Sequence, residues 1–171
     1  MDNDNINSIE NGSQMSNKEN LDNIEDLILR DGEASSLTSG ASMRPMLRQH
    51  RDIVTIKKID RPLKRGDAVL YPEKSGIFVV HRIIRVKEDN FIIRGDNNYF
   101  TERVPKEKIV GILKYFIREG KYIDCSTDWK YKCYVFYILH SYCLRYLWNK
   151  KLRPILSKIK RTIIKQKTVS D

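Results

Sequence analysis

Three side chains in this sequence of 171 residues have types suited to acyl-transfer chemistry. The first is Ser42, which lies in the segment GASMRP at positions 40–45. Glycine permits a tight turn there and proline prevents a helix, so the loop would hold a serine hydroxyl fixed and exposed, as a nucleophile requires. A serine in a Gly/Pro loop is also ordinary turn chemistry, and the loop alone does not identify a nucleophile.

A serine nucleophile needs a base, and the best placed of the three histidines is His81. His50 lies in a charged loop and His140 among apolar residues of a predicted helix, where solvated and structural roles are the simpler interpretations. His81 instead interrupts the apolar run 77–84, which predicts a buried strand. A buried imidazole either finds a hydrogen-bond partner or has its pKa lowered, and both outcomes leave a neutral base near physiological pH. A core histidine bonded to the backbone is the alternative.

Asp96 is the third candidate and lies in the segment RGDNN at positions 94–98. This composition suits a β-turn without any catalytic role. The functional interpretation of Asp96 is a carboxylate that orients His81 and stabilises the imidazolium formed during catalysis. Spacing alone does not choose between the two.

Short runs of β-forming residues, separated by turn residues, are predicted to position these side chains. The predicted strands are 52–56, 68–71, 77–86, 91–94 and 109–117. An amphipathic helix with apolar residues at 21, 24, 27 and 28 is predicted before them, with Asn20 as its cap and Gly32 as its end. Residues 34–40 have the composition of a loop. The body of the protein is therefore predicted to be mainly β.

Five segments resemble, in order, the successive boxes of the S24/S26 serine peptidases. They are GASMRP at 40–45, GDAVLY at 66–71, VHRII at 80–84, RGDNN at 94–98 and VG at 110–111. The resemblance covers residues 34–120 and is greatest to the histidine-using signal peptidases of archaea, the endoplasmic reticulum and some spore-forming bacteria. It implies a signal peptidase/LexA-like β-fold with Ser42 as nucleophile, His81 as general base and Asp96 as supporting acid.

Two departures from the signal peptidase pattern affect what the resemblance implies. Many signal peptidases carry Ser or Thr two positions before the nucleophile, whereas this sequence has Gly40, so the oxyanion hole would rely on backbone N–H groups such as that of Ser42. The usual N-terminal membrane anchor is also missing. Gly40 is closer to the self-cleaving repressors, but these use a lysine base, and Lys74 and Lys87 lie at the wrong places in the pattern.

The net charge of +10 is unevenly distributed along the chain. Residues 1–33 hold nine acidic and two basic side chains, residues 34–128 hold twelve and nineteen, and residues 129–171 hold one and eleven. The surplus therefore belongs to the C-terminal part, and a uniformly basic DNA-coating protein is disfavoured. We predict a disordered polar arm at 1–19, a catalytic domain with its leading helix at 20–125 and a helical tail at 126–171.

The tail combines an aromatic, apolar segment at 131–148 with a basic amphipathic helix after Pro154. We expect it to lie on an anionic membrane surface. A membrane span at 133–149 is less favoured, because Lys132, His140 and Arg145 interrupt the apolar segment and leave it shorter than the stretch of about 20 residues that crosses a bilayer. The N-terminus lacks the pattern of a secretory signal, and the three cysteines have no metal-ligand spacing. A cytoplasmic location, peripheral at the inner face of the membrane, is therefore expected, with no cofactor and no metal.

The leading prediction is a serine endopeptidase that cleaves a precursor or leader peptide through an acyl-enzyme. Its partner would be a peptide or precursor protein, and nucleic acid is not expected. Two alternatives remain open on the sequence. One is a non-catalytic module, derived from a peptidase, that binds peptides or a membrane surface. The other is a self-cleaving LexA-like domain, although no repressor DNA-binding helices precede Ser42.

Overall fold

The computed structural model describes residues 24–142 and Tyr146. The chain forms two compact units, Met1–Lys132 and Cys133–Asp171. The predicted arm at 1–19, the cap at Asn20 and the amphipathic helix after Pro154 lie outside the described residues. Within the described part of the chain, no helix has the length and apolar character needed to cross a bilayer.

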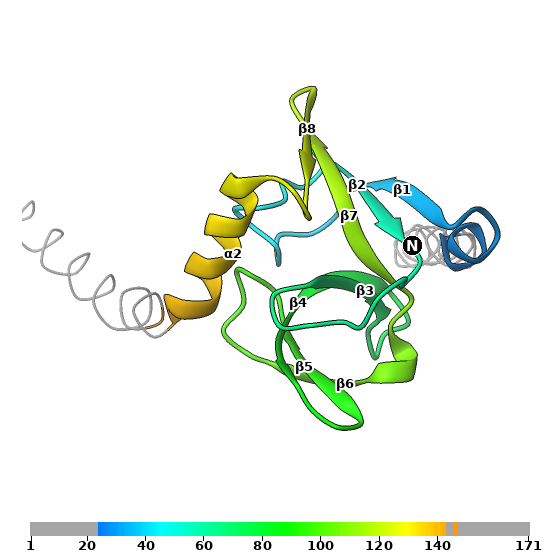
Figure 1. The fold of residues 1–171 in the computed structure, drawn as a ribbon, viewed down its shortest axis with the longest axis vertical. Helices are drawn as coiled ribbons and strands as arrows, with labels where there is room; N and C mark the ends of the chain where they lie inside the picture. The colour runs from blue at the N-terminus through cyan, green and yellow to red at the C-terminus, as the bar shows by residue number, and fades with distance from the viewer. Residues whose placement is uncertain (1–23, 143–145, 147–171) are drawn as a thin grey trace, which may run out of the picture. The chain divides into compact units, whose positions relative to one another are not determined.

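The first unit is built on one antiparallel β-sheet of eight strands (Figure 1). The strands are β1 (Glu33–Leu37), β2 (Ile53–Lys57), β3 (Ala68–Pro72), β4 (Phe78–Val86), β5 (Asn90–Arg94), β6 (Glu102–Pro105), β7 (Gly111–Arg118) and β8 (Lys121–Asp124). Their order across the sheet is β1-β2-β7-β3-β4-β5-β6, and β8 pairs with β7. A 3₁₀ turn, η1 (Lys106–Lys108), follows β6, and the helix α2 (Trp129–His140) follows β8. The prediction of a mainly β fold is confirmed.

Strand β7 joins the two halves of the sheet. Its first residues pair with β3, and from Ile112 onward it pairs with β2 and then with β8. The strands approach so closely at Gly111 that a Cβ there would lie 2.5 Å from the Ile56 side chain and 2.8 Å from the Lys57 carbonyl oxygen. Glycine is therefore required where β7 crosses from one half to the other.

The five predicted strands correspond to β2, β3, β4, β5 and β7, with ends that differ by two residues or fewer. The prediction of a loop at 34–40 is wrong, because Glu33–Leu37 forms β1. This polar segment becomes a strand by pairing along its whole length with β2, and the hydroxyl groups of Ser35 and Thr55 lie 2.6 Å apart across that pair. Strands β6 and β8 were not predicted either.

A helix occupies residues 24–31, as the apolar spacing predicts. It ends at Gly32, whose φ of 81° lies in the left-handed region and whose N–H bonds to the Ile28 carbonyl at 3.1 Å. This is the usual role of glycine after the last helical turn. The helix leads directly into β1 and buries Ile28 completely, so it is part of the domain that carries the candidate site.

The hydrophobic core beneath β3, β4 and β5 consists of large aliphatic and aromatic side chains from five strands and from the residue that follows η1. Its members are Val69, Tyr71, Ile83, Phe91, Ile93, Val104, Ile109 and Ile112. Burial of these side chains provides the rigid support on which β4 presents its central residues.

Candidate active site

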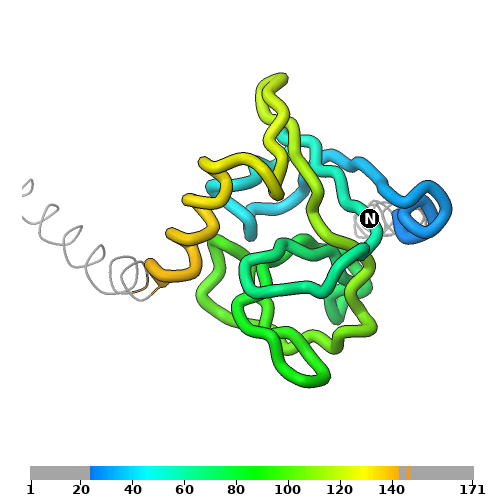
Figure 2. The backbone as a smooth tube through the Cα atoms, in the orientation of Figure 1, coloured from blue at the N-terminus to red at the C-terminus, as the bar shows by residue number. Residues whose placement is uncertain are grey.

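Residues 38–52 form the loop that connects β1 to β2 (Figure 2). Ser42 lies in this loop. The two ends of this loop are close together, since the Thr38 N–H donates to the Asp52 carbonyl at 3.0 Å and the His50 N–H donates to the Thr38 carbonyl at 2.8 Å. Thr38 also donates its hydroxyl to the Arg48 carbonyl at 2.6 Å. Long loops closed in this way are frequently functional, and here the closure keeps the Ser42 segment in one place on the sheet.

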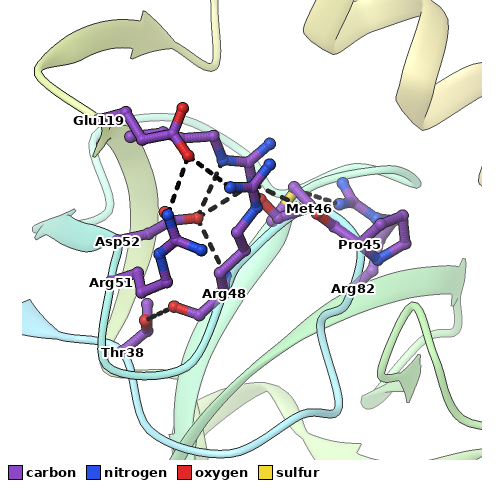
Figure 3. A network of polar contacts seen from close by, with 9 residues as sticks. Thr38, Pro45, Met46, Arg48, Arg51, Asp52, Arg82 and Glu119 are labelled. Atoms are coloured by element: carbon purple, nitrogen blue, oxygen red, sulfur yellow. Dashed lines mark hydrogen bonds and ion pairs between the residues drawn. The ribbon is translucent and has the colours of Figure 1, made fainter.

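A buried carboxylate fastens this loop to β7 (Figure 3). Asp52 is completely buried, and its Oδ2 accepts a hydrogen bond from the Arg48 N–H at 2.9 Å and another from Arg118 Nη2 at 3.0 Å. Arg118 also donates to the carbonyl oxygens of Pro45 and Met46. One guanidinium on β7 therefore holds both the middle and the end of the loop that contains Ser42.

A second set of ion pairs lies on the outside of the same loop (Figure 3). Glu119 Oε1 accepts from Arg48 at 2.6 Å and from Arg51 at 3.1 Å. All three side chains are exposed, and exposed ion pairs contribute only about 0–1 kcal/mol each. The buried contacts of Asp52 therefore contribute more to holding the loop.

The turn between β5 and β6 clamps the other side of Ser42. The Asn97 N–H donates to the Ser42 carbonyl at 2.7 Å, and the Asn97 side chain reaches the Ala41 carbonyl at 3.3 Å. A Cβ on Gly95 would lie 2.8 Å from the Ser42 carbonyl oxygen and 3.0 Å from its Cβ. Any larger residue at Gly95 would have to push the Ser42 segment aside.

His81 lies in the middle of β4 and is 3% exposed. Its Nδ1 is 2.9 Å from the hydroxyl oxygen of Tyr71, and its Nε2 is buried with no hydrogen-bond partner within residues 24–142. Burial lowers the pKa of the imidazole, against the opposite effect of the nearby carboxylates Glu73 and Asp96. The ring is therefore neutral near pH 7.

Asp96 is 1% exposed and pairs with Arg82, the residue after His81. Arg82 Nε donates to Asp96 Oδ1 and Arg82 Nη2 donates to Oδ2, both at 2.7 Å. Successive side chains of a strand point to opposite faces, so Arg82 meets Asp96 while His81 faces Tyr71 on β3. The structure thus differs from the expected pairing: the His81 ring bonds to Tyr71, and Asp96 acts on His81 through its charge.

Both ionic groups of this pair are deeply buried, with side chains 0% exposed. Burial by itself lowers the pKa of Arg82, but Asp96 and Tyr131 outweigh it and the pKa is raised overall. Arg82 also donates to the Gly66 carbonyl at 2.8 Å and to the Met46 sulfur at 3.0 Å. It therefore links β4 to the loop that carries Ser42.

These contacts bring Ser42 and Asp96 together, whereas the His81 ring lies on the opposite face of β4 from Arg82, and neither of its nitrogens bonds to Ser42 within residues 24–142. Gly95 packs against Ser42, and its neighbour Arg94 pairs with Arg82, which adjoins His81. Asp96 follows directly in the same turn. Three segments distant in the sequence, at 42, 81–82 and 94–97, meet at the junction of β4 and β5.

A cleft of about 710 Å³ opens beside Ser42. Residues 34–43 and 77–80 supply most of its lining, together with Leu70, Val54 and Ile56. Most of these side chains are small or aliphatic. A cleft of this size and character is suited to a peptide segment with small or apolar side chains.

Both main lining segments have a strand edge without a partner among the described residues. β1 pairs only with β2, and the pairing of β5 with β4 begins at Arg82, so Phe78–Val80 pair only with β3. An unpaired strand edge presents N–H and C=O groups that can bind an extended peptide as an added strand. Ser42 belongs to the first of these lining segments and follows β1 along the chain.

The sequence did not identify three residues that contact the predicted site, namely Tyr71, Arg82 and Glu102. A signal for Tyr71 was present in the sequence. Val69 on β3 pairs with His81 on β4, and Tyr71 lies two residues after Val69, on the same face of the sheet. Glu102 is on β6, which was not predicted. The ion pair of Arg82 depends on a turn whose geometry the sequence alone does not fix.

Comparisons of the sequence with models of protein families and with curated proteins gave no match. Within the described residues, no group of His, Cys, Asp and Glu side chains is arranged to hold a metal ion.

Proposed function

We propose that this protein is a serine endopeptidase of the signal peptidase-like class, with the corresponding β-fold around its active site. The observation that carries the proposal is the position of Ser42 in a cleft whose lining segments have unpaired strand edges. A peptide bound as an added strand would present its backbone carbonyl groups to this serine. The neutral, buried His81 close to the same junction supplies a base.

In the proposed reaction, Ser42 Oγ attacks the carbonyl carbon of the scissile peptide bond while His81 Nε2 takes its proton. The backbone N–H of Ser42 stabilises the oxyanion of the tetrahedral intermediate. His81 then returns the proton to the leaving amine as the C–N bond breaks. Water then attacks the acyl carbon while His81 takes its proton, and as the ester C–O bond breaks His81 returns the proton to Ser42 Oγ, which releases the carboxylic acid product and restores free Ser42.

The proposed substrate is an extended segment of a precursor or leader peptide with small side chains near the cut. Ala34, Ser36 and Ala41 are small residues of the cleft lining, and Leu70 and Val80 add aliphatic surface. Such a lining favours compact apolar side chains over charged ones, because a charge would lose its hydration without gaining a partner.

We also propose that the tail places the enzyme on the cytoplasmic face of an anionic membrane. Its basic residues lie mostly in 150–171, outside the described residues. Sedimentation with vesicles containing anionic lipid tests this proposal, with the full chain compared with a chain ending at residue 149. Equal binding by the two chains would contradict the membrane role and leave the peptidase proposal standing.

Digestion of a mixture of blocked synthetic peptides, followed by mass spectrometry, tests the peptidase proposal. Wild type should cleave a subset of peptides, whereas Ser42→Ala and His81→Ala should lose nearly all activity. Matched controls are Ser75→Ala, in the β3–β4 turn, and His50→Asn, which keeps a residue type that tolerates the φ of 57° at that position. Both controls should cleave like wild type. Equal cleavage by all five proteins would contradict the proposal.

A further inference from the structure

The two ring nitrogens of His81 have different surroundings. Nδ1 is 2.9 Å from the Tyr71 hydroxyl oxygen, whereas Nε2 is buried with no partner in the described part of the chain. A neutral imidazole carries one N–H, and the hydrogen bond made by one nitrogen decides which nitrogen holds the proton. The direction of the Tyr71 hydrogen bond therefore determines whether Nε2 can act as a base.

Glu102 fixes that direction. The Tyr71 hydroxyl is 3.2 Å from Glu102 Oε2, and an ionised carboxylate only accepts hydrogen bonds. Burial raises the pKa of the Tyr71 hydroxyl, with the charge of Glu102 acting in the same sense, so the hydroxyl keeps its proton and donates a hydrogen bond to Glu102. The oxygen of Tyr71 then accepts from His81 Nδ1–H.

The contact between His81 and Glu102 passes through the tyrosine. His81 Nδ1 and Glu102 Oε1 are 3.8 Å apart, too far for a direct hydrogen bond but close enough for the carboxylate to favour a positive charge on the ring. The rings of Tyr71 and His81 also pack edge to face, with centroids 5.9 Å apart. This packing restricts the orientation of the imidazole.

We propose that Tyr71 and Glu102 are positioning residues that hold His81 in the Nδ1–H tautomer and leave the Nε2 lone pair free to accept a proton. Their relay runs from His81 on β4 through Tyr71 on β3 to Glu102 on β6. It takes the orienting role that was predicted for Asp96. The catalytic consequence rests on the proposed function, but the tautomer itself is a property of the free protein.

Besides Glu102 of the relay, three charged groups surround His81 and enter any experiment that varies pH. Glu73 follows β3, Asp96 follows β5, and both favour the protonated ring. Arg82 adjoins His81 on β4 and is neutralised by Asp96. Glu102 faces the ring from β6. Since these groups are unchanged by Tyr71→Phe, that substitution isolates the effect of the hydroxyl.

Nuclear magnetic resonance of the full chain labelled with ¹⁵N-histidine tests the tautomer without any substrate. In wild type at neutral pH, His81 should show a protonated Nδ1 and an unprotonated Nε2, assigned by comparison with His81→Gln. Tyr71→Phe removes the acceptor and should shift His81 toward the Nε2–H tautomer. Glu102→Gln should shift it in the same direction, because the introduced amide can donate to Tyr71 and let the hydroxyl donate to Nδ1. Tyr115→Phe and Glu107→Gln are matched controls that should leave the spectrum unchanged.

The result that would overturn the proposal is an Nε2–H tautomer in wild type, or a His81 spectrum that Tyr71→Phe leaves unchanged in a folded protein. Circular dichroism checks that each variant is folded. Activity is the second readout: Tyr71→Phe should lower kcat by about 10²-fold, the lower end of what a positioned base contributes, with little change in KM. The predicted tautomer in a protein that cleaves no peptide would instead contradict the proposed function and leave the relay intact.

Discussion

Replacing Asp96 with alanine removes a negative charge from a region that water does not reach. Both side chains of the Arg82–Asp96 pair are 0% exposed, and two hydrogen bonds of 2.7 Å join them. The partners that Arg82 keeps include the Gly66 carbonyl, the Tyr131 hydroxyl and the Met46 sulfur, and none of these three carries a charge. The variant must therefore bury a guanidinium whose carboxylate has been removed.

The expected loss of folding free energy is about 3–5 kcal/mol, the usual cost of removing one partner from a buried ion pair. A single domain is stable by only about 5–15 kcal/mol, so the loss is a large fraction of the total. With a urea m value of about 2 kcal/mol/M, the unfolding midpoint should fall by about 1.5–2.5 M. Urea titration followed by far-ultraviolet circular dichroism measures this shift.

The double variant Arg82→Met/Asp96→Ala removes both charges and provides the control. Without Arg82, the Gly66 carbonyl and the Tyr131 hydroxyl lose their hydrogen-bond donor, and each loss lowers the free energy of unfolding by about 1–3 kcal/mol. The double variant does not, however, leave one charge of this pair buried without the other. It should therefore be more stable than the sum of the two single variants predicts. Strict additivity of Arg82→Met and Asp96→Ala, or a midpoint shift below about 0.5 M for Asp96→Ala, would refute the reasoning.

Three further predictions concern the Ser42 loop and the base. Gly95→Ala should lower kcat/KM by about 10²-fold, because the new Cβ would displace the backbone of Ser42; a wild-type rate in steady-state kinetics on a cleaved peptide would contradict this. Asp52→Ala should lower the free energy of unfolding by about 1–3 kcal/mol, which is less than Asp96→Ala, because the Arg118 side chain that pairs with Asp52 is 23% exposed and can reach water. A larger loss for Asp52→Ala than for Asp96→Ala in urea titrations would contradict this ranking of the two ion pairs. Because burial lowers the pKa of His81 and the neutral ring is the active form, activity should stay constant above about pH 6.5 and fall only below it. Since the pKa of His81 is lower in the folded state than in the unfolded chain, the unfolded chain is protonated first, and the free energy of unfolding should decline as the pH falls through this range. A midpoint above about pH 6.5 in the pH dependence of kcat/KM would contradict His81 as the base.

The strands that carry apolar side chains were predictable from the sequence. Val69 and Ile83 belong to runs of apolar, β-branched and aromatic residues between turn residues, and such runs form strands wherever one face is buried. The helix at 24–31 was predictable for the same reason, since its apolar spacing and Gly32 are local signals.

The strands that the sequence missed form because of their partners. Ser35 and Ser36 have little preference for β structure, and their segment is extended because β2 offers a complete ladder of hydrogen bonds. The prediction from composition alone was therefore a loop. Tertiary pairing decided the outcome at this position.

The candidate site was predictable in its residue types and less so in its hydrogen bonds. The burial of His81 followed from the apolar run around it, and its lowered pKa is the electrostatic result of that burial. Its partner did not follow, because the predicted partner was Asp96 or the backbone, whereas the ring bonds to Tyr71. The choice depends on which face of β4 each side chain occupies, and the register of β3 and β5 sets that.

The central claim is that Ser42 forms a covalent acyl-enzyme with a peptide. Rapid acid quenching of wild type with the peptide that it cleaves fastest, followed by mass spectrometry of the fragment containing Ser42, measures this directly. We expect an acyl adduct on Ser42 that His81→Ala greatly reduces and Ser42→Ala abolishes. Turnover without an adduct at Ser42, together with cleavage by Ser42→Ala at the wild-type rate, would contradict it.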